Sequence, residues 1–282
     1  MNLPGTRIEA NGLSFHVVDE GEGTPIVLLH GFPDSSFVWR HQIPGLADAG
    51  FRVIAPDTRG RGQSDRPDAV EDYLVTALAA DVTAIMDALG IERAHIVGHD
   101  SGAATAWFVA TLAPDRVDHL VALSVGRPGT YRRTIRDLRR GWYMFMFQLD
   151  EAEDFLTRNG WENFRNWSAT APDTEQYVQI LSEPGALRAG LNYYRANVSP
   201  AVLLGEPFEL PKIASPTLGV WSTLDFALTE EQMTASEAEV AAEWRYERLE
   251  GIGHWIPTEA PEHLTELLVE FLPTAEPASR RP

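Results

Sequence analysis

The sequence predicts an α/β fold in which a mostly parallel central sheet is flanked by helices on both faces. Three observations lead to this prediction. Short apolar segments that end in glycine or aspartate recur along the chain, stretches with helical periodicity alternate with them, and one long helical stretch interrupts the alternation. Such apolar segments are typical of strands buried on both faces, and their alternation with helices is typical of a parallel sheet.

The first half of the chain is expected to supply a hairpin and the first parallel strands. Asn11-Gly12 lies between two strand-like segments, and this dipeptide is a strong signal for a two-residue hairpin turn. Residues 73–90 carry apolar side chains at helical spacing, and Gly90 indicates where that helix ends. The apolar segments expected to be strands cover residues 25–31, 51–57, 94–100 and 117–125.

A helical insertion is predicted between two parts of the sheet-forming domain. Residues 130–210 contain no buried-strand pattern and are rich in aromatic side chains, so we expect a helical cap there. The first part of the core would then be residues 1–129 and the second part residues 211–282. After the cap we expect strands at 217–222 and 244–250, and helices near 229–242 and 259–272.

Composition and charge exclude several classes of partner and site. The formal net charge of −18 repels phosphate backbones and anionic membrane surfaces, so neither nucleic-acid nor membrane binding is expected. The chain has no cysteine, which excludes disulfides and thiolate metal sites. The N-terminal residues lack the pattern of a secretory signal, and no apolar run is long enough to span a membrane, so we expect a cytoplasmic protein.

The segment Gly98-His99-Asp100-Ser101-Gly102 predicts a sharp strand-to-helix turn with an aspartate at its apex. Such a turn needs small residues two before and two after the exposed residue, and the two glycines meet that condition only for Asp100. Ser101, the more obvious nucleophile, would have His99 at one crowded position. An aspartate here could instead be a simple helix N-cap, and other polar residues at strand ends argue against that interpretation.

Three further features follow predicted strands and would meet Asp100 at one edge of the sheet. The loop at 30–33 follows the first parallel strand, Asp225 follows the strand at 217–222, and His254 lies in a glycine-containing loop after the last strand. Ligands of open α/β sheets bind at the carboxyl ends of the strands. The chain order of nucleophile, acid and histidine is that of the α/β-hydrolase triad.

Along nearly its whole length the sequence resembles the α/β-hydrolase superfamily and, within it, the epoxide hydrolases. The motifs that carry the resemblance are His-Gly-Phe-Pro at 30–33, Gly-His-Asp at 98–100, Asp225-Phe226, and Gly-His-Trp at 253–255. The resemblance implies an α/β-hydrolase fold with a helical lid. It also implies a catalytic triad of Asp100, Asp225 and His254, and neither a metal ion nor an organic cofactor.

The resemblance also assigns residues in the cap and around the pocket. WYMFMFQ resembles the first lid-tyrosine segment and LNYYR the second, which assigns Tyr143 and Tyr194, while Tyr193 stands where many relatives have tryptophan. Ser101 also replaces a common tryptophan, which changes the pocket surface but keeps the backbone N–H. We expect a small apolar epoxide as substrate and a monomer or homodimer. The residues expected to contact the substrate are His30, Phe32, Pro33, Trp142 and Trp255.

These residue types suit the opening of an epoxide. A saturated ring carbon needs in-line attack by an anion, and a carboxylate such as Asp100 is already ionised near neutral pH, whereas a serine hydroxyl is not. The attack would form an ester between the substrate and the enzyme. The leaving alkoxide needs a proton, which Tyr143 and Tyr194 would supply as general acids.

The ester would then be hydrolysed by an activated water molecule. His254 is expected to take a proton from that water, and Asp225 is expected to orient the imidazole. The backbone N–H groups of Phe32 and Ser101 are expected to stabilise the oxyanion that forms. The product would be a vicinal diol.

Three alternatives remain open from the sequence. A haloalkane or haloacid dehalogenase would use the same aspartate and histidine, but the tryptophan that often donates to the halide is Ser101 here. A serine esterase would need Ser101 in the nucleophile register. A non-enzymatic binding module is compatible with the fold, but such a module usually lacks part of the triad.

Overall fold

A single mixed sheet forms the centre of the computed structural model, which describes residues 3–129 and 133–274. Within these residues the sheet has eight strands in the order β1-β2-β4-β3-β5-β6-β7-β8. The β1–β2 and β2–β4 pairs are antiparallel, and all other pairs are parallel. The strands are β1 (Thr6–Ala10), β2 (Leu13–Glu20), β3 (Thr24–Leu29), β4 (Phe51–Pro56), β5 (Ala94–His99), β6 (Val117–Leu123), β7 (Thr217–Ser222) and β8 (Trp244–Leu249).

Helices cover both faces of the sheet, which explains why its central strands are apolar on both sides. Val27 and Leu29 of β3 pack in a core cluster with α2 and α3, whereas Ile26 and Leu28 pack in a second cluster with α1 and α12. The predicted fold class is therefore confirmed. The α-helices outside the insertion are α1 (Gln42–Asp48), α2 (Val75–Ala88), α3 (Ser101–Leu112), α10 (Glu230–Thr234), α11 (Ile256–Glu259) and α12 (Pro261–Phe271). Four 3₁₀ turns within the described residues lie at Ser36–Trp39, Val70–Tyr73, Pro114–Arg116 and Ala235–Glu239.

The predicted hairpin is present between β1 and β2. Asn11 and Gly12 have φ angles of 47° and 77°, so both central residues of the turn are in the left-handed region. That conformation is the reason for the Asn-Gly preference in two-residue hairpin turns, because asparagine tolerates it and glycine adopts it freely. The hairpin places β2 beside β4 at one side of the parallel strands.

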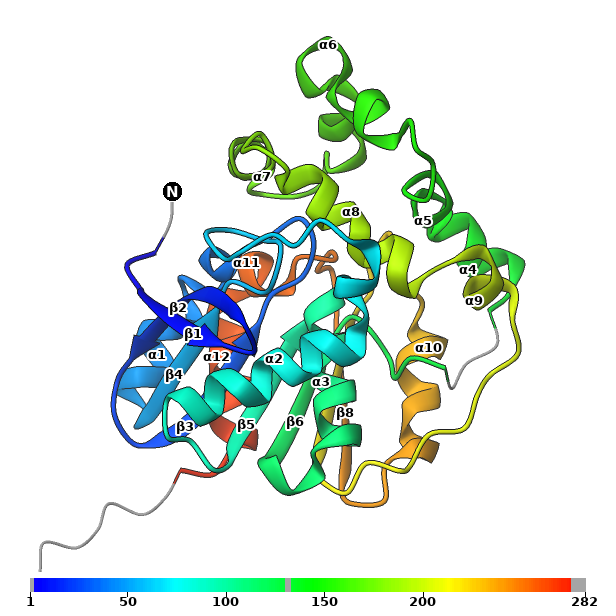
Figure 1. The fold of residues 1–282 in the computed structure, drawn as a ribbon. Coiled ribbons are helices and arrows are strands. Elements are labelled where there is room, and N and C mark those ends of the chain that lie inside the picture. The colour runs from blue at the N-terminus through cyan, green and yellow to red at the C-terminus, as the bar shows by residue number, and fades with distance from the viewer. Residues whose placement is uncertain (1–2, 130–132, 275–282) are drawn as a thin grey trace, which may run out of the picture.

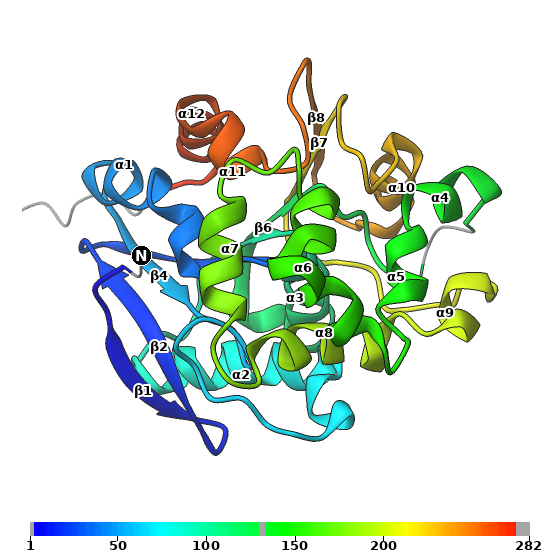
Figure 2. The ribbon, with the colours of Figure 1, turned by 90° about the horizontal axis from the view of Figure 1, so that it is seen from above.

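The inserted helices α4–α9 lie between β6 and β7 in the chain and form a layer of their own. Figure 1 shows α5, α6, α7 and α8 above the rest of the molecule, and Figure 2, seen from above, shows them covering the central strands. The helix α6 is broken at Arg158–Trp161, where the backbone leaves the helical conformation. The inserted helices are α4 (Ile135–Arg140), α5 (Trp142–Met146), α6 (Ala152–Trp167), α7 (Thr174–Leu181), α8 (Ala186–Asn197) and α9 (Pro200–Leu204).

The division of the chain into core and cap stays a prediction. The expected boundary at residue 130 lies outside the described residues, and residues 205–210 continue from α9 toward β7 without a helix or strand. A third core cluster connects the two layers, since it joins side chains of the inserted helices to Phe32 and Trp255 from loops of the sheet layer. The inserted helices are therefore packed directly on the ends of the strands.

The helix expected near 229–242 is shorter than predicted. The α-helix α10 ends at Thr234 and continues only as a 3₁₀ turn to Glu239. The reason is a parallel bridge between Ile213 and Val240, in which the Ile213 N–H donates to the Glu239 carbonyl and the Ala241 N–H donates to the Ile213 carbonyl. These backbone groups are used by the bridge and are not available to a longer helix.

Candidate active site

Asp100 is the single residue between β5 and α3, and it occupies the apex of a tight turn. Its φ and ψ angles are 53° and −123°, a conformation that is strained for a residue with a side chain. A Cβ atom on Gly98 would lie 2.3 Å from the Gly102 carbonyl oxygen, and one on Gly102 would lie 2.2 Å from the Leu29 carbonyl oxygen. Both flanking glycines are thus required by backbone atoms that approach closely, as expected from the sequence.

The structure brings Asp100, His254 and Asp225 together from the segments that follow β5, β8 and β7. His254 Nε2 lies 3.6 Å from Asp100 Oδ2, and His254 Nδ1 donates to Asp225 Oδ2 at 2.9 Å. The other oxygen of Asp225 accepts backbone N–H bonds from Ala227 at 2.8 Å and Leu228 at 2.9 Å. Asp225 therefore has a fixed orientation, which in turn fixes the imidazole.

The two carboxylates raise the basicity of the histidine between them. Burial by itself would lower the pKa of His254, but the charges and hydrogen bonds of Asp225 and Asp100 outweigh burial and raise that pKa to about 10. Burial would raise the pKa of Asp100, but the hydrogen bond and charge of His254 hold it well below its ordinary range. At neutral pH Asp100 is therefore an anion, which is the form that a nucleophile needs.

His99 supports the loop that carries His254. Its Nε2 donates to the His254 carbonyl at 2.9 Å, and its ring lies 5.0 Å from the His254 ring. Burial, and then the nearby charge of His254, lowers the pKa of His99 to about 4. His99, the last residue of β5, is therefore neutral at physiological pH and holds the backbone of His254 in place.

The loop after β3 brings a backbone donor to the nucleophile. The Phe32 N–H donates to Asp100 Oδ1 at 2.9 Å. A Cβ atom on Gly31 would lie 2.4 Å from Asp100 Cβ, so only glycine allows the loop to approach so closely. Ser101 begins α3, and the first N–H groups of a helix have no partner within the helix. Two backbone donors therefore belong to residues beside the Asp100 carboxylate.

Tyr143 on α5 and Tyr194 on α8 belong to one buried aromatic cluster above the nucleophile. Their ring centroids lie 6.2 Å apart, and the Tyr194 ring lies 5.5 Å from the Phe32 ring. Burial, followed by the negative charge of Asp100, raises the pKa of both phenols well above its ordinary value of 10.0. Both hydroxyl groups are therefore protonated at neutral pH and can act as donors or acids.

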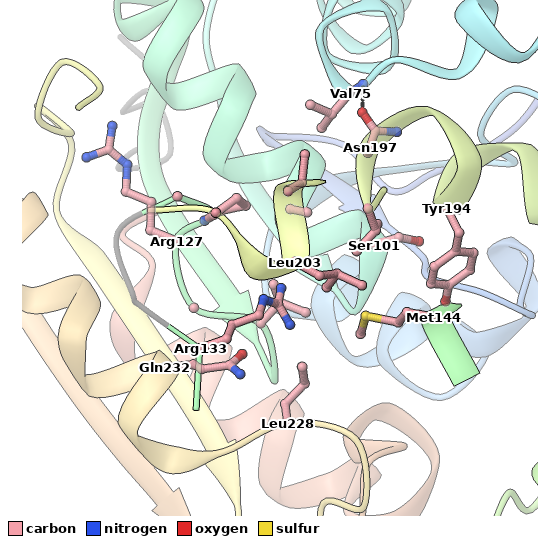
Figure 3. A pocket seen from close by; sticks show the side chains of 18 of the residues that line it. Val75, Ser101, Arg127, Arg133, Met144, Tyr194, Asn197, Leu203, Leu228 and Gln232 are labelled. Atoms are coloured by element: carbon pink, nitrogen blue, oxygen red, sulfur yellow. Dashed lines mark hydrogen bonds between the residues drawn. The ribbon is translucent and has the colours of Figure 1, made fainter. Parts of the chain in front are cut away.

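A cavity of about 180 Å³ opens from the nucleophile between α3 and the inserted helices. Asp100 and Ser101 line it, together with Tyr193 and Tyr194 from α8. Figure 3 shows Ser101 and Tyr194 in this pocket. Met144, Leu203 and other apolar side chains line the remainder. Most of this surface is apolar, with a few polar groups, as is usual for small-molecule sites.

The residues expected to contact the substrate lie in different surroundings. His30 is buried, and its Nε2 accepts the Thr58 N–H at 3.0 Å, so its ring is used within the loops. Trp142 is 53% exposed on α5, and Trp255 stacks on Phe226 at 5.4 Å. The Phe32 ring packs against the Tyr194 ring, and the Phe32 N–H donates to Asp100. The described residues that line the cavity do not include His30, Phe32, Pro33, Trp142 or Trp255, whose substrate contacts stay predictions.

Arg61 is a residue near the nucleophile that sequence reasoning did not single out. It lies in the loop at 56–67, where Asp57 has a structural role because it accepts the Ser36 N–H at 2.7 Å and the Gln63 N–H at 2.8 Å. Arg61, however, is fully enclosed, and its Nη1 donates to Ser101 Oγ at 3.1 Å. No pattern distinguishes it in the sequence, since an arginine in a polar loop is usually solvated.

The guanidinium of Arg61 is held between aromatic rings. It lies 5.5 Å from the Phe32 ring centroid and 5.5 Å from the Tyr193 ring centroid, which is within range of a cation–π interaction. Burial lowers the pKa of Arg61, and the negative charge of Asp100 opposes that effect. Ser101 thus replaces the tryptophan of many relatives with a hydroxyl group that accepts a hydrogen bond from a buried cation.

Metal-ion clusters and membrane-spanning helices are both absent from the part of the chain that the structure describes. Among residues 3–129 and 133–274 there is no group of three or more His, Cys, Asp and Glu side chains placed to hold a metal ion. No helix within the same residues is both long enough and apolar enough to cross a lipid bilayer.

Comparison with known proteins shows similarity over almost the whole chain. Residues 24–261 match the family described as alpha/beta hydrolase fold. The chain is 34% identical to epoxide hydrolase A of Mycobacterium tuberculosis, over 96% of this chain and 98% of that protein. It belongs to the epoxide hydrolase family of the α/β hydrolases. It is also 31% identical to an epoxide hydrolase of Caballeronia sordidicola, over 95% of this chain and 93% of that protein.

Solved structures of the epoxide hydrolase family have the same architecture. The crystal structure of epoxide hydrolase A from Mycobacterium thermoresistibile superposes with a TM-score of 0.82 at 27% identity, covering 97% of this chain and 99% of that one. An epoxide hydrolase from metagenomes of hot environments superposes with a TM-score of 0.86 at 30% identity, with the same coverage of 97% and 99%. The similarity therefore includes the inserted helices as well as the sheet.

Proposed function

We propose that this member of the epoxide hydrolase family converts an epoxide and water to a vicinal diol, through an ester between the substrate and Asp100. One observation carries the proposal: a buried, ionised aspartate at the apex of the turn lies 3.6 Å from His254 Nε2, while His254 Nδ1 bonds Asp225. The relatives that match over nearly their full length, from M. tuberculosis and C. sordidicola, are named epoxide hydrolases.

Ring opening is proposed to use Asp100 and two phenols of the inserted helices, which act as a cap. A carboxylate oxygen of Asp100 attacks a ring carbon, the carbon–oxygen bond breaks, and the ring oxygen becomes an alkoxide. Tyr194 lines the cavity with Asp100, Tyr143 lies in the same aromatic cluster, and the charge of Asp100 acts on both phenols. Their hydroxyl groups would bind the ring oxygen, and one of them gives it a proton. General acids of this kind contribute about 10²–10⁴-fold to the rate.

Ester formation changes the state of His254. In the resting site the imidazolium has two carboxylate neighbours, and their charges raise its pKa to about 10. Once Asp100 is an ester, one of those charges is gone, so the pKa of His254 must fall. The tyrosine that protonated the alkoxide is left as a tyrosinate. His254 gives its proton to this tyrosinate, which restores the tyrosine, and the neutral imidazole is then free to act as a base.

Hydrolysis of the ester is proposed to return every group to its starting state. His254 Nε2 takes a proton from water, and the hydroxide attacks the ester carbonyl of Asp100. The backbone N–H groups of Phe32 and Ser101 stabilise the oxyanion, and one such donor is worth about 3–4 kcal/mol. When the intermediate collapses, His254 protonates the departing diol oxygen, and the proton left on Asp100 returns to His254.

Ser101 is not placed to compete with Asp100 as the nucleophile. It is the first residue of α3, and its hydroxyl oxygen accepts a hydrogen bond from Arg61 at 3.1 Å. The base His254 forms an ion pair with Asp100 at 3.6 Å and a hydrogen bond with Asp225 at 2.9 Å. We therefore expect Ser101→Ala to keep its hydrolase activity, an outcome that an esterase using Ser101 would not allow.

The covalent intermediate provides the test of the proposed function. His254→Gln removes the base but leaves Asp100 intact, so incubation with a reactive epoxide such as styrene oxide should add the mass of one substrate molecule to the protein. The double variant Asp100→Ala/His254→Gln is the matched control and should gain no mass.

Three other outcomes would contradict the proposal. Mass addition to the double variant would place the ester elsewhere, and an absence of adduct with every reactive epoxide would refute the covalent route. If the wild-type protein released halide from haloalkanes and formed no diol from epoxides, the chain would be a dehalogenase that uses the same triad.

A further inference from the structure

The cavity that begins at Asp100 ends at a second group of polar side chains. Arg133, which precedes α4, and Gln232 of α10 both line it. In Figure 3 these two side chains enter the pocket from one side of the view, whereas Ser101 and Tyr194 lie toward the other. Leu203 and Met144 line the same cavity, so a molecule reaching both groups would pass an apolar surface.

Four charged side chains line this cavity in the described part of the chain, and three of them are accounted for by a proposed role, an ion pair or an exposed position. Asp100 is the proposed nucleophile, and Glu206 is exposed in the segment after α9. Arg127 forms an ion pair with Glu239 at 3.0 Å, and its other nitrogen donates to the Pro211 carbonyl at 2.5 Å. Arg133 is the remaining charge.

Arg133 has no hydrogen bond or ion pair with any of the described residues. The acid nearest to it in sequence is Asp137, whose oxygens accept hydrogen bonds from Thr134 at 2.6 Å and from Thr229 at 2.7 Å. Burial lowers the pKa of Arg133, and electrostatic interaction with Tyr143 and then with Asp137 opposes that effect. A cation that is partly removed from water without a partner costs free energy, which a bound anion would recover.

We propose that Arg133 is a specificity-determining residue that binds a carboxylate of the substrate, with Gln232 as a second donor. The preferred substrate is then an epoxide that carries a carboxylate at the far end of an apolar chain, which differs from the small apolar epoxide expected from the sequence. A guanidinium presents two parallel donors that match a carboxylate. The Gln232 amide bonds Asp137 only at 3.4 Å and has a second N–H to offer. This inference rests on the proposed function.

The positive charge of Arg133 is needed because the molecule as a whole repels anions. With a formal net charge of −18, the protein gives a carboxylate substrate no general attraction. Arg133 supplies an attractive site inside a pocket whose other deep charge, Asp100, is an anion. The same charges would hold the carboxylate end away from Asp100, so the epoxide end would face the nucleophile.

The test compares an ω-epoxy carboxylate with its methyl ester, which differ only in the charged group. Epoxyundecanoate and methyl epoxyundecanoate would be assayed with the wild-type protein and with Arg133→Met. We expect the variant to raise KM for the carboxylate about 10- to 100-fold, the value of a charge-assisted hydrogen bond, and to leave KM for the ester unchanged. The charge of Arg133 acts on Tyr143, so loss of that charge can alter kcat, but any such change should be the same for the acid and the ester.

Two further variants show whether the effect belongs to the charge of Arg133. Arg136→Met removes the same charge from an exposed side chain of the neighbouring helix, paired with Glu231 at 2.7 Å, and should alter KM for neither substrate. Arg133→Lys restores the charge and should recover part of the lost affinity for the carboxylate. Equal changes of KM for acid and ester in Arg133→Met, or a wild-type preference for the ester, would overturn the inference.

A binding measurement separates this inference from the proposed function. Calorimetry of undecanoate and methyl undecanoate needs no chemical step, and the wild-type protein should bind the acid more tightly than the ester, with the difference lost in Arg133→Met. If the acid bound in this way but no epoxide were hydrolysed, the anion site would stand and the proposed reaction would fail. If epoxides were hydrolysed but acid and ester bound equally, only the anion site would fail.

Discussion

Replacement of Asp225 by asparagine should block the second half of the proposed reaction and leave the first half intact. In the wild-type site one Asp225 oxygen accepts the N–H groups of Ala227 and Leu228, at 2.8 and 2.9 Å, and the other accepts His254 Nδ1–H at 2.9 Å. An asparagine must place its amide oxygen toward the two backbone donors, because its NH₂ group would oppose them. The NH₂ group then faces His254.

This arrangement forces the imidazole into the wrong tautomer. His254 Nδ1 has to accept from the asparagine NH₂, so the ring proton moves to Nε2, the atom that must take a proton from water. Restoring the productive tautomer would set two donors against each other, 2.9 Å apart in the wild-type geometry, and would also lack the aspartate charge. A triad altered in this way loses about 10⁴-fold in rate, which corresponds to about 5.5 kcal/mol.

Rapid-quench kinetics with intact-mass detection would measure both steps. With a reactive epoxide in excess, Asp225→Asn should form the Asp100 ester within the first turnover and then hold it, while diol release falls about 10⁴-fold. Asp118→Asn makes the same chemical change at a surface ion pair with Arg93 and should behave like the wild-type protein. Diol release from Asp225→Asn within tenfold of the wild-type rate would refute the reasoning, and so would slow release without accumulated ester.

Other substitutions test the acid, the turn and a buried carboxyl group. Tyr194→Phe should slow ester formation about 10²-fold in single-turnover assays, whereas Tyr193→Phe, on the same cavity, should change it less than tenfold; equal effects would contradict the assignment. Gly102→Ala should lower the free energy of unfolding in urea by about 1–3 kcal/mol, because the added Cβ would lie 2.2 Å from the Leu29 carbonyl, and unchanged stability would contradict that estimate. Burial raises the pKa of Asp34 from 3.8 to about 8, so between these pH values the unfolded chain releases a proton that the folded chain keeps, and stability falls as pH rises. Asp34→Asn should therefore be more stable than the wild-type protein near pH 8 and above and should approach it near pH 4, as measured by thermal unfolding across that range.

The sequence was sufficient for the sheet layer because its signals are local. Apolar segments predicted the parallel strands to within a few residues, and Asn11-Gly12 predicted the hairpin. The register of the turn followed from Gly98 and Gly102, since only glycine tolerates the carbonyl contacts found there. The helix near 229–242 was predicted too long, because its end depends on a bridge to Ile213, a contact that local periodicity does not contain.

The polar residues around the cavity were harder to predict than the triad. Asp100, Asp225 and His254 follow strands, and strand ends can be recognised in a sequence. Arg61 and Arg133 lie in irregular segments, and an arginine in such a segment is normally solvated. Their surroundings are created by tertiary packing, since Arg61 is enclosed by aromatic rings from distant parts of the chain and Arg133 faces a cavity formed between layers.

The place of the inserted helices in the chain has a consequence for how such an enzyme can diversify. The segment that holds α4–α9 leaves at the end of β6 and returns at β7, and these two strands are hydrogen-bonded neighbours, with Leu120 opposite Thr217. One contiguous stretch of gene therefore encodes the helical roof of the pocket, while Asp100, Asp225 and His254 are encoded outside it. Recombination confined to that stretch would exchange the inserted helices as one unit. It would change substrate preference without disturbing the strand register or the catalytic residues.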